Sequence, residues 1–244
     1  MSDFYTIVDQ VFRDWNYSSP RILHSLLRAL KHEVHVDCGT YRALSACWTA
    51  QAMKENGSGK VHCIDNWSLT EHVDRCGDPR THAESNMVAC GVRDWIEIHQ
   101  GETSDPVMWP DKIDSCYVDA WHSYEAAKSD LQMAIDRGAR LIALDDTENC
   151  VGPRMLVDEL RSDTQFCWHW QTLDLHSDNG MTIFMRIQPR RPITFSQELP
   201  PPHPGIDLRP LSLEQQKRHF EEASVSTGLD YSGLYLQTEH DIKL

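Results

Sequence analysis

The stretch Phe166-Cys-Trp-His-Trp-Gln-Thr-Leu-Asp-Leu-His-Ser-Asp-Asn-Gly-Met-Thr-Ile-Phe-Met-Arg-Ile-Gln188 decides the fold. Its two β-rich runs, Phe166–Leu175 and Met181–Gln188, predict two strands. The residues between them end in Asn179-Gly180, a hairpin signal, and leave no room for a crossover helix. We therefore expect the last strand to run antiparallel to its neighbours.

Upstream of the hairpin, short apolar runs alternate with helical patterns, which is typical of a mostly parallel sheet covered by helices on both faces. Together with the hairpin, the pattern predicts an α/β fold with a seven-stranded sheet. The expected strands are Val34–Asp37, Val61–Asp65, Trp95–His99, Ser115–Asp119 and Arg140–Asp145, and the expected helices are Leu44–Met53, Ala83–Val92, Ser123–Ile135 and Pro153–Leu160.

Three regions differ in composition. Residues 1–33 have two helical patterns and are expected to form an N-terminal helical lid over one sheet edge, and residues 34–188 form the core. Residues 189–244 are a Pro-rich tail with one helix, expected to pack on the body or on a partner subunit. Homo-oligomer formation through the N-terminal helices or this tail is left open.

Charge and cysteine content exclude several classes of protein. The 244 residues carry 23 basic and 37 acidic side chains, a net charge of −14, which repels nucleic acid and anionic membranes. The 8 cysteines form no C-x-x-C pair, so a zinc knuckle and a redox dithiol are disfavoured. With no secretion signal and no apolar run near 18 residues, a cytoplasmic protein with reduced thiols is expected.

Acidic residues close four of the five predicted parallel strands, at the edge where open α/β sheets bind ligands. Gly39 follows the first strand, but the next residues lack the other glycines of a phosphate-binding loop. A nicotinamide oxidoreductase is therefore disfavoured. A ligand with a ribose and no phosphate remains open, because Asp65 is placed to accept hydrogen bonds from ribose hydroxyls.

Three segments carry a family resemblance: Asp37-Cys-Gly-Thr-Tyr-Arg-Ala-Leu-Ser45, Cys63-Ile-Asp-Asn-Trp67, and Tyr117-Val-Asp-Ala-Trp-His-Ser-Tyr-Glu125 followed by Asp130. They resemble the Rossmann-like class I methyltransferases that use S-adenosylmethionine. The closest subgroup contains small-molecule O-methyltransferases of the macrocin type and cephalosporin-hydroxylase-like proteins. The chain departs from the family at Ala43, where glycine is usual, and at Asp37, where Glu is commoner.

The resemblance implies a cofactor site for S-adenosylmethionine. It implies that Asp65 holds the ribose, that Trp67 and the Gly101–Ser104 turn flank the ribose and adenine, and that Asp119 also belongs to the site. Taken singly, Tyr41 or Trp67 could equally be core residues and Ser45 a cap. The residues implied to line the methionine end are Asp37, Gly39, Thr40, Tyr41 and Ser45.

Asp119, Asp145 and Asp146 form a second constellation. Three carboxylates at adjacent strand ends repel one another unless they are protonated, separated or bridged by a cation such as Mg²⁺. In the resembling O-methyltransferases the matching positions bind a divalent ion. Asp145 and Asp146 converge only if the chain turns at Asp146; otherwise Asp146 caps the turn at Thr147.

His122 follows Asp119 by three residues and is the candidate base that takes the acceptor proton. A structural role, through Asp130 or a helix cap, is the alternative. The sequence thus predicts a methyltransferase acting on a hydroxyl of a small molecule with metal assistance. The rivals are a metal-independent methyltransferase with His122 alone as base and a non-catalytic, methyltransferase-like assembly module.

Overall fold

The computed structural model describes residues 3–13, 18–68, 77–176 and 179–187. The Pro-rich tail and the helix predicted within residues 189–244 lie outside this part of the chain. Among the described residues, no helix has the length and apolar character needed to span a membrane.

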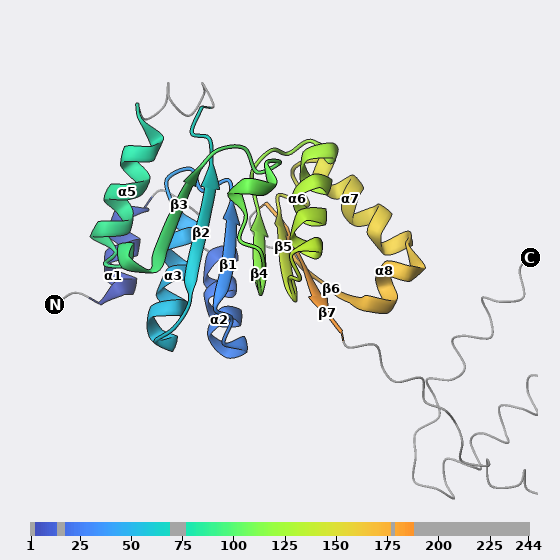
Figure 1. Ribbon diagram of the computed structural model, residues 1–244, viewed down its shortest axis with the longest axis horizontal. Coiled ribbons are helices and arrows are strands. Elements are labelled where there is room, and N and C mark those ends of the chain that lie inside the picture. Colours follow the sequence, from blue (N-terminus) through green and yellow to red (C-terminus); the bar gives the residue numbers. More distant parts are fainter. Residues whose placement is uncertain (1–2, 14–17, 69–76, 177–178, 188–244) are drawn as a thin grey trace, which may run out of the picture. The chain divides into compact units, whose positions relative to one another are not determined.

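A seven-stranded sheet forms the centre of the fold, with the order β3-β2-β1-β4-β5-β7-β6 (Figure 1). Strands β1 to β5 pair in parallel, and β7 is antiparallel to both β5 and β6, so the predicted hairpin and antiparallel last strand are confirmed. The order reverses between β1 and β4, where ligands bind in open α/β sheets. The strands are β1 (Val34–Cys38), β2 (Lys60–Asp65), β3 (Ile96–Gln100), β4 (Ser115–Val118), β5 (Leu141–Asp145), β6 (Trp170–Leu175) and β7 (Met181–Arg186).

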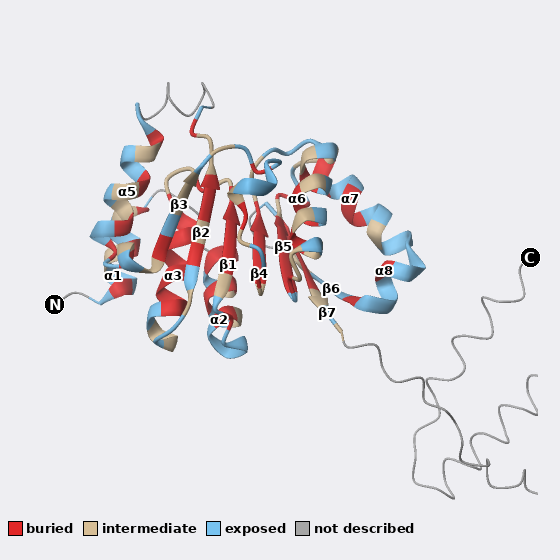
Figure 2. Cartoon of the chain, in the orientation of Figure 1, coloured by how far each residue is buried: buried red, intermediate tan, exposed pale blue. Residues whose placement is uncertain are grey.

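Helices pack on both faces of the sheet, because alternate strand residues point to opposite sides. Val8 of α1 and Leu23 of α2 are wholly buried in apolar clusters with the sheet, and Figure 2 shows the central strands buried between the helices. One face carries α1 (Phe4–Val11), α2 (Ser18–Leu30), α3 (Leu44–Asn56) and α5 (Pro79–Ala89), and the other carries α6 (Tyr124–Asp136), α7 (Val151–Ser162) and α8 (Thr164–His169).

The predicted start of the sixth strand is wrong. Residues 166–169 belong to α8, and β6 begins at Trp170. Asp163 explains the difference, because its carboxylate accepts hydrogen bonds from the backbone N–H groups of Gln165 and Phe166 and so caps a helix. The Phe166 ring stacks on Trp170, with 5.8 Å between the ring centroids, so its burial does not require a strand.

The predicted cover on both faces is incomplete beside β3. The connection from β3 to β4, residues 101–114, contains only the short 3₁₀ helix η2 (Pro106–Met108) and no α-helix. Pro106 begins this turn and Pro110 follows it, and proline cannot donate the hydrogen bond that would continue a helix. One face of the edge strand β3 is therefore left without a helix over it.

Candidate functional site

The loops after β1, β2, β3 and β4 are tied together at the carboxyl ends of the strands. Three backbone hydrogen bonds join them, from Gly39 N to the Ile64 oxygen, from Gly101 N to the Asp65 oxygen and from Asp119 N to the Cys38 oxygen, each 3.0 Å long. The parallel register thus gathers the predicted site loops at one edge of the sheet, where β1 and β4 adjoin.

Gly39 permits the closest of these approaches. Its φ is +86°, and a Cβ built on it would lie 2.1 Å from the backbone oxygen of Asp119. Ala43 also has a left-handed backbone, with φ +70°, which costs a residue with a side chain about 1–2 kcal/mol. A left-handed backbone suits glycine, the residue that the family resemblance leads us to expect at this position. Tyr41 is also left-handed, with φ +44°, so the loop predicted to hold the cofactor contains two strained residues.

Asp37 is fully buried at the end of β1. The Thr40 hydroxyl donates to its Oδ1 at 3.0 Å, whereas Oδ2 has no hydrogen-bond partner among the described residues. Burial raises the pKa of Asp37 to about 6, against the lowering effect of the nearby Ser45 and Thr40 hydroxyls. The predicted residues of the methionine end therefore surround a carboxylate that needs a further donor.

Asp65 organises the loops on either side of it. Its Oδ2 accepts from the Tyr41 N–H and its Oδ1 from the Trp67 N–H, each at 2.7 Å. The Trp67 indole N–H donates to the Tyr41 carbonyl at 2.9 Å, and Trp67 is 8% exposed. Each carboxylate oxygen has more than one lone pair, so Asp65 can hold these loops and still accept from a ribose.

The Gly101–Ser104 turn is held in place through Thr103. Thr103 is buried, its carbonyl accepts from the Trp109 indole N–H at 2.7 Å, and Ser104 is exposed. Asp130 of α6 is buried against Thr103, and burial raises its pKa to about 6. Asp130 thus supports this turn.

His122 lies between two carboxylates. Its Nε2 is 3.3 Å from Asp119 Oδ1 and 3.1 Å from Asp146 Oδ2. The contact with Asp146 depends on a turn there, and the turn is present, with φ +56°. A hydrogen bond to Asp130 would not account for these two contacts. His122 is also not the cap of α6, because Ser123 is the cap and its hydroxyl accepts from the Ala126 N–H.

Asp145 accepts a hydrogen bond from a tyrosine, whereas the other two predicted metal ligands contact His122. Its Oδ2 accepts a hydrogen bond from the buried Tyr117 hydroxyl at 2.6 Å. Burial, followed by the charge of Asp119, raises the pKa of Asp145 to about 8, and burial raises that of Asp119 to about 6. The hydrogen bond to Asp119 raises the pKa of His122. The cluster therefore carries more carboxylates than it has positive charges to balance them.

Sequence reasoning missed three residues of this cluster. Tyr117 lies in a segment of the family resemblance but has no expected role there. Cys150 precedes α7 and Gly152 lies within it, and neither belongs to a motif. Ligand atoms of His122, Asp146 and Cys150 lie within 4.8 Å of one another. A Cβ on Gly152 would lie 2.4 Å from the His122 carbonyl oxygen, so this glycine lets α7 approach His122.

The raised pKa values predict that the protein loses stability as the pH rises from about 5 to about 8. Asp145 and Asp119 hold their protons in the folded state at pH values where the unfolded chain releases them, and His122 loses its stabilising charge in the same direction. In Asp145→Asn the fall in melting temperature between these pH values should shrink. The matched control Asp111→Asn, at a fully exposed carboxylate, should keep the wild-type fall. Equal pH dependence in the two variants would contradict the assignment.

Comparison with known families finds one match. Residues 36–147 match the family model of a methyltransferase domain. The match and the strand order agree on a class I methyltransferase domain over these residues. No curated protein sequence matches it. The matched region runs from β1 to the turn after β5, so it includes both the Asp37 loop and the His122 cluster of the methyltransferase domain.

Solved structures agree on the methyltransferase fold. One is the O-methyltransferase TomG from Streptomyces achromogenes, involved in tomaymycin synthesis and solved with S-adenosylmethionine, with TM-score 0.56, 16% identity, and coverage of 77% of this chain and 91% of that one. Another is the methyltransferase PaMTH1 from Podospora anserina with S-adenosylhomocysteine (TM-score 0.56, 12% identity, coverage 77% and 89%). A third is an O-methyltransferase from Bacillus cereus with S-adenosylhomocysteine (TM-score 0.54, 16% identity, coverage 74% and 91%).

Proposed function

We propose that the methyltransferase domain transfers the methyl group of S-adenosylmethionine to a hydroxyl oxygen of a small molecule. The observation that carries the proposal is the position of His122 Nε2 between Asp119 and Asp146, beside the Gly39 loop. Methyl transfer is an in-line displacement, so its main requirements are alignment of donor and acceptor and removal of the acceptor proton. Loops fixed by backbone hydrogen bonds and a basic imidazole supply both.

The residues present fit S-adenosylmethionine. Its methionine end carries a positive ammonium and sulfonium, and the loop after β1 offers Asp37, whose buried Oδ2 lacks a donor among the described residues. Asp65 can accept from ribose hydroxyls. When bound, the cofactor supplies the electrophilic methyl group. We assign Asp37, Gly39, Thr40, Tyr41 and Ser45 to the methionine end and Asp65, Trp67, Gly101, Ser104 and Asp119 to the rest of the cofactor site.

His122 is accessible to an acceptor, since 41% of its side chain is exposed. The hydrogen bond to Asp119 raises its pKa, which makes the neutral imidazole a stronger base. Three exposed apolar side chains belong to these segments. Trp121 directly precedes His122, and Val151 and Met155 lie on either side of Gly152, which approaches the His122 backbone. We propose that these side chains receive the apolar part of the acceptor.

We propose that a divalent cation, with Mg²⁺ as the preferred candidate, binds Asp119, Asp145 and Asp146. Support comes from the excess of carboxylates and from Asp146 Oδ1, which is buried without a hydrogen-bond partner in the described part of the chain. A bound ion would stabilise a deprotonated acceptor oxygen. The metal-independent alternative is favoured by one observation: His122 Nε2 already lies between two of the carboxylates and balances part of their charge.

One activity experiment separates these two mechanisms. The full chain is incubated with S-adenosylmethionine and a panel of hydroxylated small molecules, and formation of S-adenosylhomocysteine is measured. We expect turnover with at least one acceptor, loss of turnover with a chelator, and recovery with Mg²⁺ or Mn²⁺. Full turnover after chelation would contradict the metal and leave His122 alone as base. Failure of S-adenosylmethionine to bind at all would contradict the proposed function itself.

The remaining proposals concern partners and location. The described cysteines are free thiols, which supports a cytoplasmic setting with reduced thiols. The net charge of −14 supports a small-molecule partner and argues against nucleic acid and anionic membranes. Self-association through the N-terminal helices or the C-terminal tail stays a prediction.

A further inference from the structure

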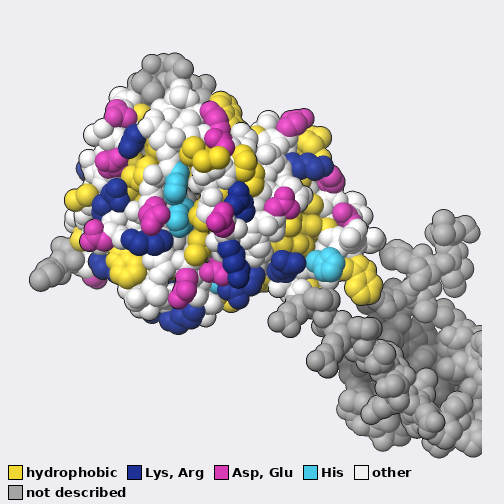
Figure 3. All heavy atoms as spheres, viewed as in Figure 1, with side chains coloured by type: hydrophobic (Ala, Val, Ile, Leu, Met, Phe, Trp, Pro, Cys, Tyr) yellow, Lys and Arg dark blue, Asp and Glu magenta, His cyan; other side chains and the backbone are white. Residues whose placement is uncertain are grey.

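Two histidines and a glutamate lie together on the face of the sheet that has no helix beside β3. In the parallel register His62 of β2 is opposite Glu97 of β3, and Ile64 is opposite His99. Because side chains two apart on a strand share a face, His62, Glu97 and His99 point to the same side. In Figure 3 histidine side chains reach the surface in the middle of this face. The cluster therefore faces solvent and is separate from the core beneath α3 and α5.

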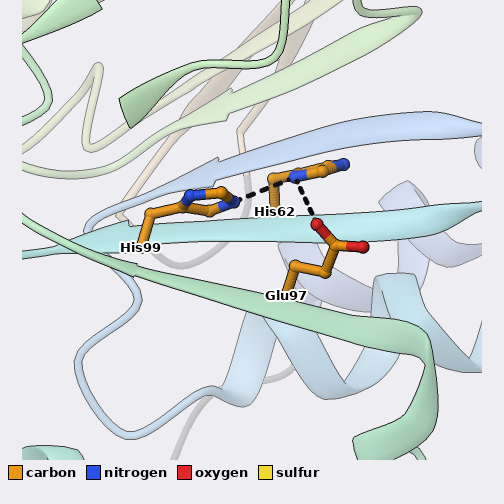
Figure 4. A group of neighbouring side chains, drawn as sticks. All are labelled: His62, Glu97 and His99. Atoms are coloured by element: carbon orange, nitrogen blue, oxygen red, sulfur yellow. Dashed lines mark hydrogen bonds and ion pairs between the residues drawn. The ribbon is translucent and has the colours of Figure 1, made fainter. Parts of the chain in front are cut away.

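His99 and Glu97 both approach the Nδ1 atom of His62 (Figure 4). His62 Nδ1 is 3.0 Å from His99 Nε2 and 3.5 Å from Glu97 Oε2. The imidazole rings stack with 5.2 Å between centroids and 26° between planes. One ligand atom from each residue lies within 4.8 Å of the other two. His62 has 14% of its side chain exposed and Glu97 51%, so the site is largely buried at His62 and open to solvent at Glu97.

Neither protonation state of His62 Nδ1 gives a favourable hydrogen bond to both His99 and Glu97. If His62 Nδ1 carries a proton, that proton faces two acceptors, His99 Nε2 and Glu97 Oε2, and can align with only one of them. If Nδ1 is bare, it accepts from His99 while its lone pair faces the negative carboxylate. A cation bound between His62 Nδ1, His99 Nε2 and Glu97 Oε2 would instead accept a lone pair from each of them.

We propose that His62, Glu97 and His99 bind a divalent transition-metal ion of the Zn²⁺ type, with solvent water completing the coordination. Two imidazole nitrogens and a carboxylate are a ligand set that zinc accepts, whereas Mg²⁺ prefers oxygen ligands alone. Metal–ligand bonds of about 2.0–2.1 Å in a tetrahedron put neighbouring ligand atoms about 3.3 Å apart. The His62–His99 and His62–Glu97 separations, 3.0 and 3.5 Å, bracket that value, and the His99–Glu97 pair lies within 4.8 Å.

The charges around the cluster are compatible with a cation. Glu97 places a carboxylate 3.5 Å from the His62 ring and so supplies negative charge beside the two imidazoles. The position also gives the ion a structural consequence. It would join β2 to the edge strand β3 about three residues, or about 10 Å, before Asp65. Both strands end in loops of the cofactor site, so metal binding should stabilise the fold that holds those loops.

The test uses the full chain after treatment with a chelator. Calorimetric titration with Zn²⁺ measures affinity, and the visible spectrum of bound Co²⁺ reports its ligands. We expect His99→Gln and Glu97→Gln each to weaken Zn²⁺ binding at this site at least about 100-fold, more than loss of an outer-shell partner typically does. His169→Gln, at an exposed histidine at the end of α8, is the matched control and should bind as the wild type does. Metal-free melting temperatures establish that each variant is folded.

The cluster of His122, Asp146 and Cys150 is the competing site and is distinguished by its thiol. Cobalt bound to His62, Glu97 and His99 should show no thiolate-to-cobalt charge-transfer band, and its spectrum should persist in Cys150→Ser. The proposal is overturned if His99→Gln and Glu97→Gln bind Zn²⁺ with wild-type affinity, or if Cys150→Ser abolishes all binding. Because His99 and Glu97 lie outside the proposed cofactor site, either outcome leaves the methyltransferase proposal standing.

Discussion

His122→Gln is expected to lower kcat at least about tenfold while the affinity for S-adenosylmethionine stays unchanged. Positioned general bases contribute about 10²–10⁴-fold, and His122 is the imidazole that the fold presents between Asp119 and Asp146. Glutamine keeps a hydrogen-bonding side chain of similar reach but cannot accept a proton near neutral pH. Steady-state kinetics with the acceptor, and calorimetric titration with S-adenosylmethionine, measure the two effects separately.

A pH–rate profile decides whether His122 acts as the base or only holds its neighbours. The acidic limb of the wild-type profile should disappear in His122→Gln, because no imidazole remains to be protonated. His169→Gln, at an exposed histidine on α8, should retain both kcat and the limb. If His122→Gln keeps the limb and a near-normal kcat, His122 is structural. Proton removal would then fall to a metal-bound acceptor or to solvent.

Local signals were sufficient for most of the fold, and they place the predicted site at one edge of the sheet. Asn179-Gly180 left no length for a crossover, so the antiparallel β7 followed from chain connectivity alone. The acidic strand ends could be placed because parallel strands bring their carboxyl ends to one edge. The glycine expected in the first loop is Gly39, and its close approach to the Asp119 backbone, which a Cβ would block, supports that prediction.

Pairwise contacts could not be predicted, because they depend on packing between distant segments. Nothing in the sequence shows that Tyr117 donates to Asp145 or that Gly152 brings α7 against His122. His62 and His99 fall in two predicted strands, and only the β2–β3 register makes them neighbours. The metal set Asp119, Asp145 and Asp146 stays a prediction: the turn at Asp146 that it needs is present, but Asp145 is engaged by Tyr117.

Asp65→Ala is expected to weaken binding of S-adenosylmethionine roughly 10- to 150-fold, the equivalent of about 1.5–3 kcal/mol for a charged hydrogen-bond partner. Calorimetric titration measures the loss. The carboxylate also accepts from the Tyr41 and Trp67 N–H groups, so its removal leaves two backbone donors without that partner. Part of the loss could therefore come from a disturbed loop and not from the missing ribose contact.

Asp65→Asn separates these two causes. Its amide keeps one acceptor oxygen for a backbone N–H, but it has lost the negative charge and replaces the second acceptor with a donor. We expect it to melt closer to the wild type than Asp65→Ala does, and still to bind S-adenosylmethionine at least about tenfold more weakly. Asp111→Ala, which removes one fully exposed carboxylate, controls for net charge and should bind normally. If both Asp65 variants bind as tightly as the wild type, Asp65 only holds its loops and the ribose must be recognised elsewhere.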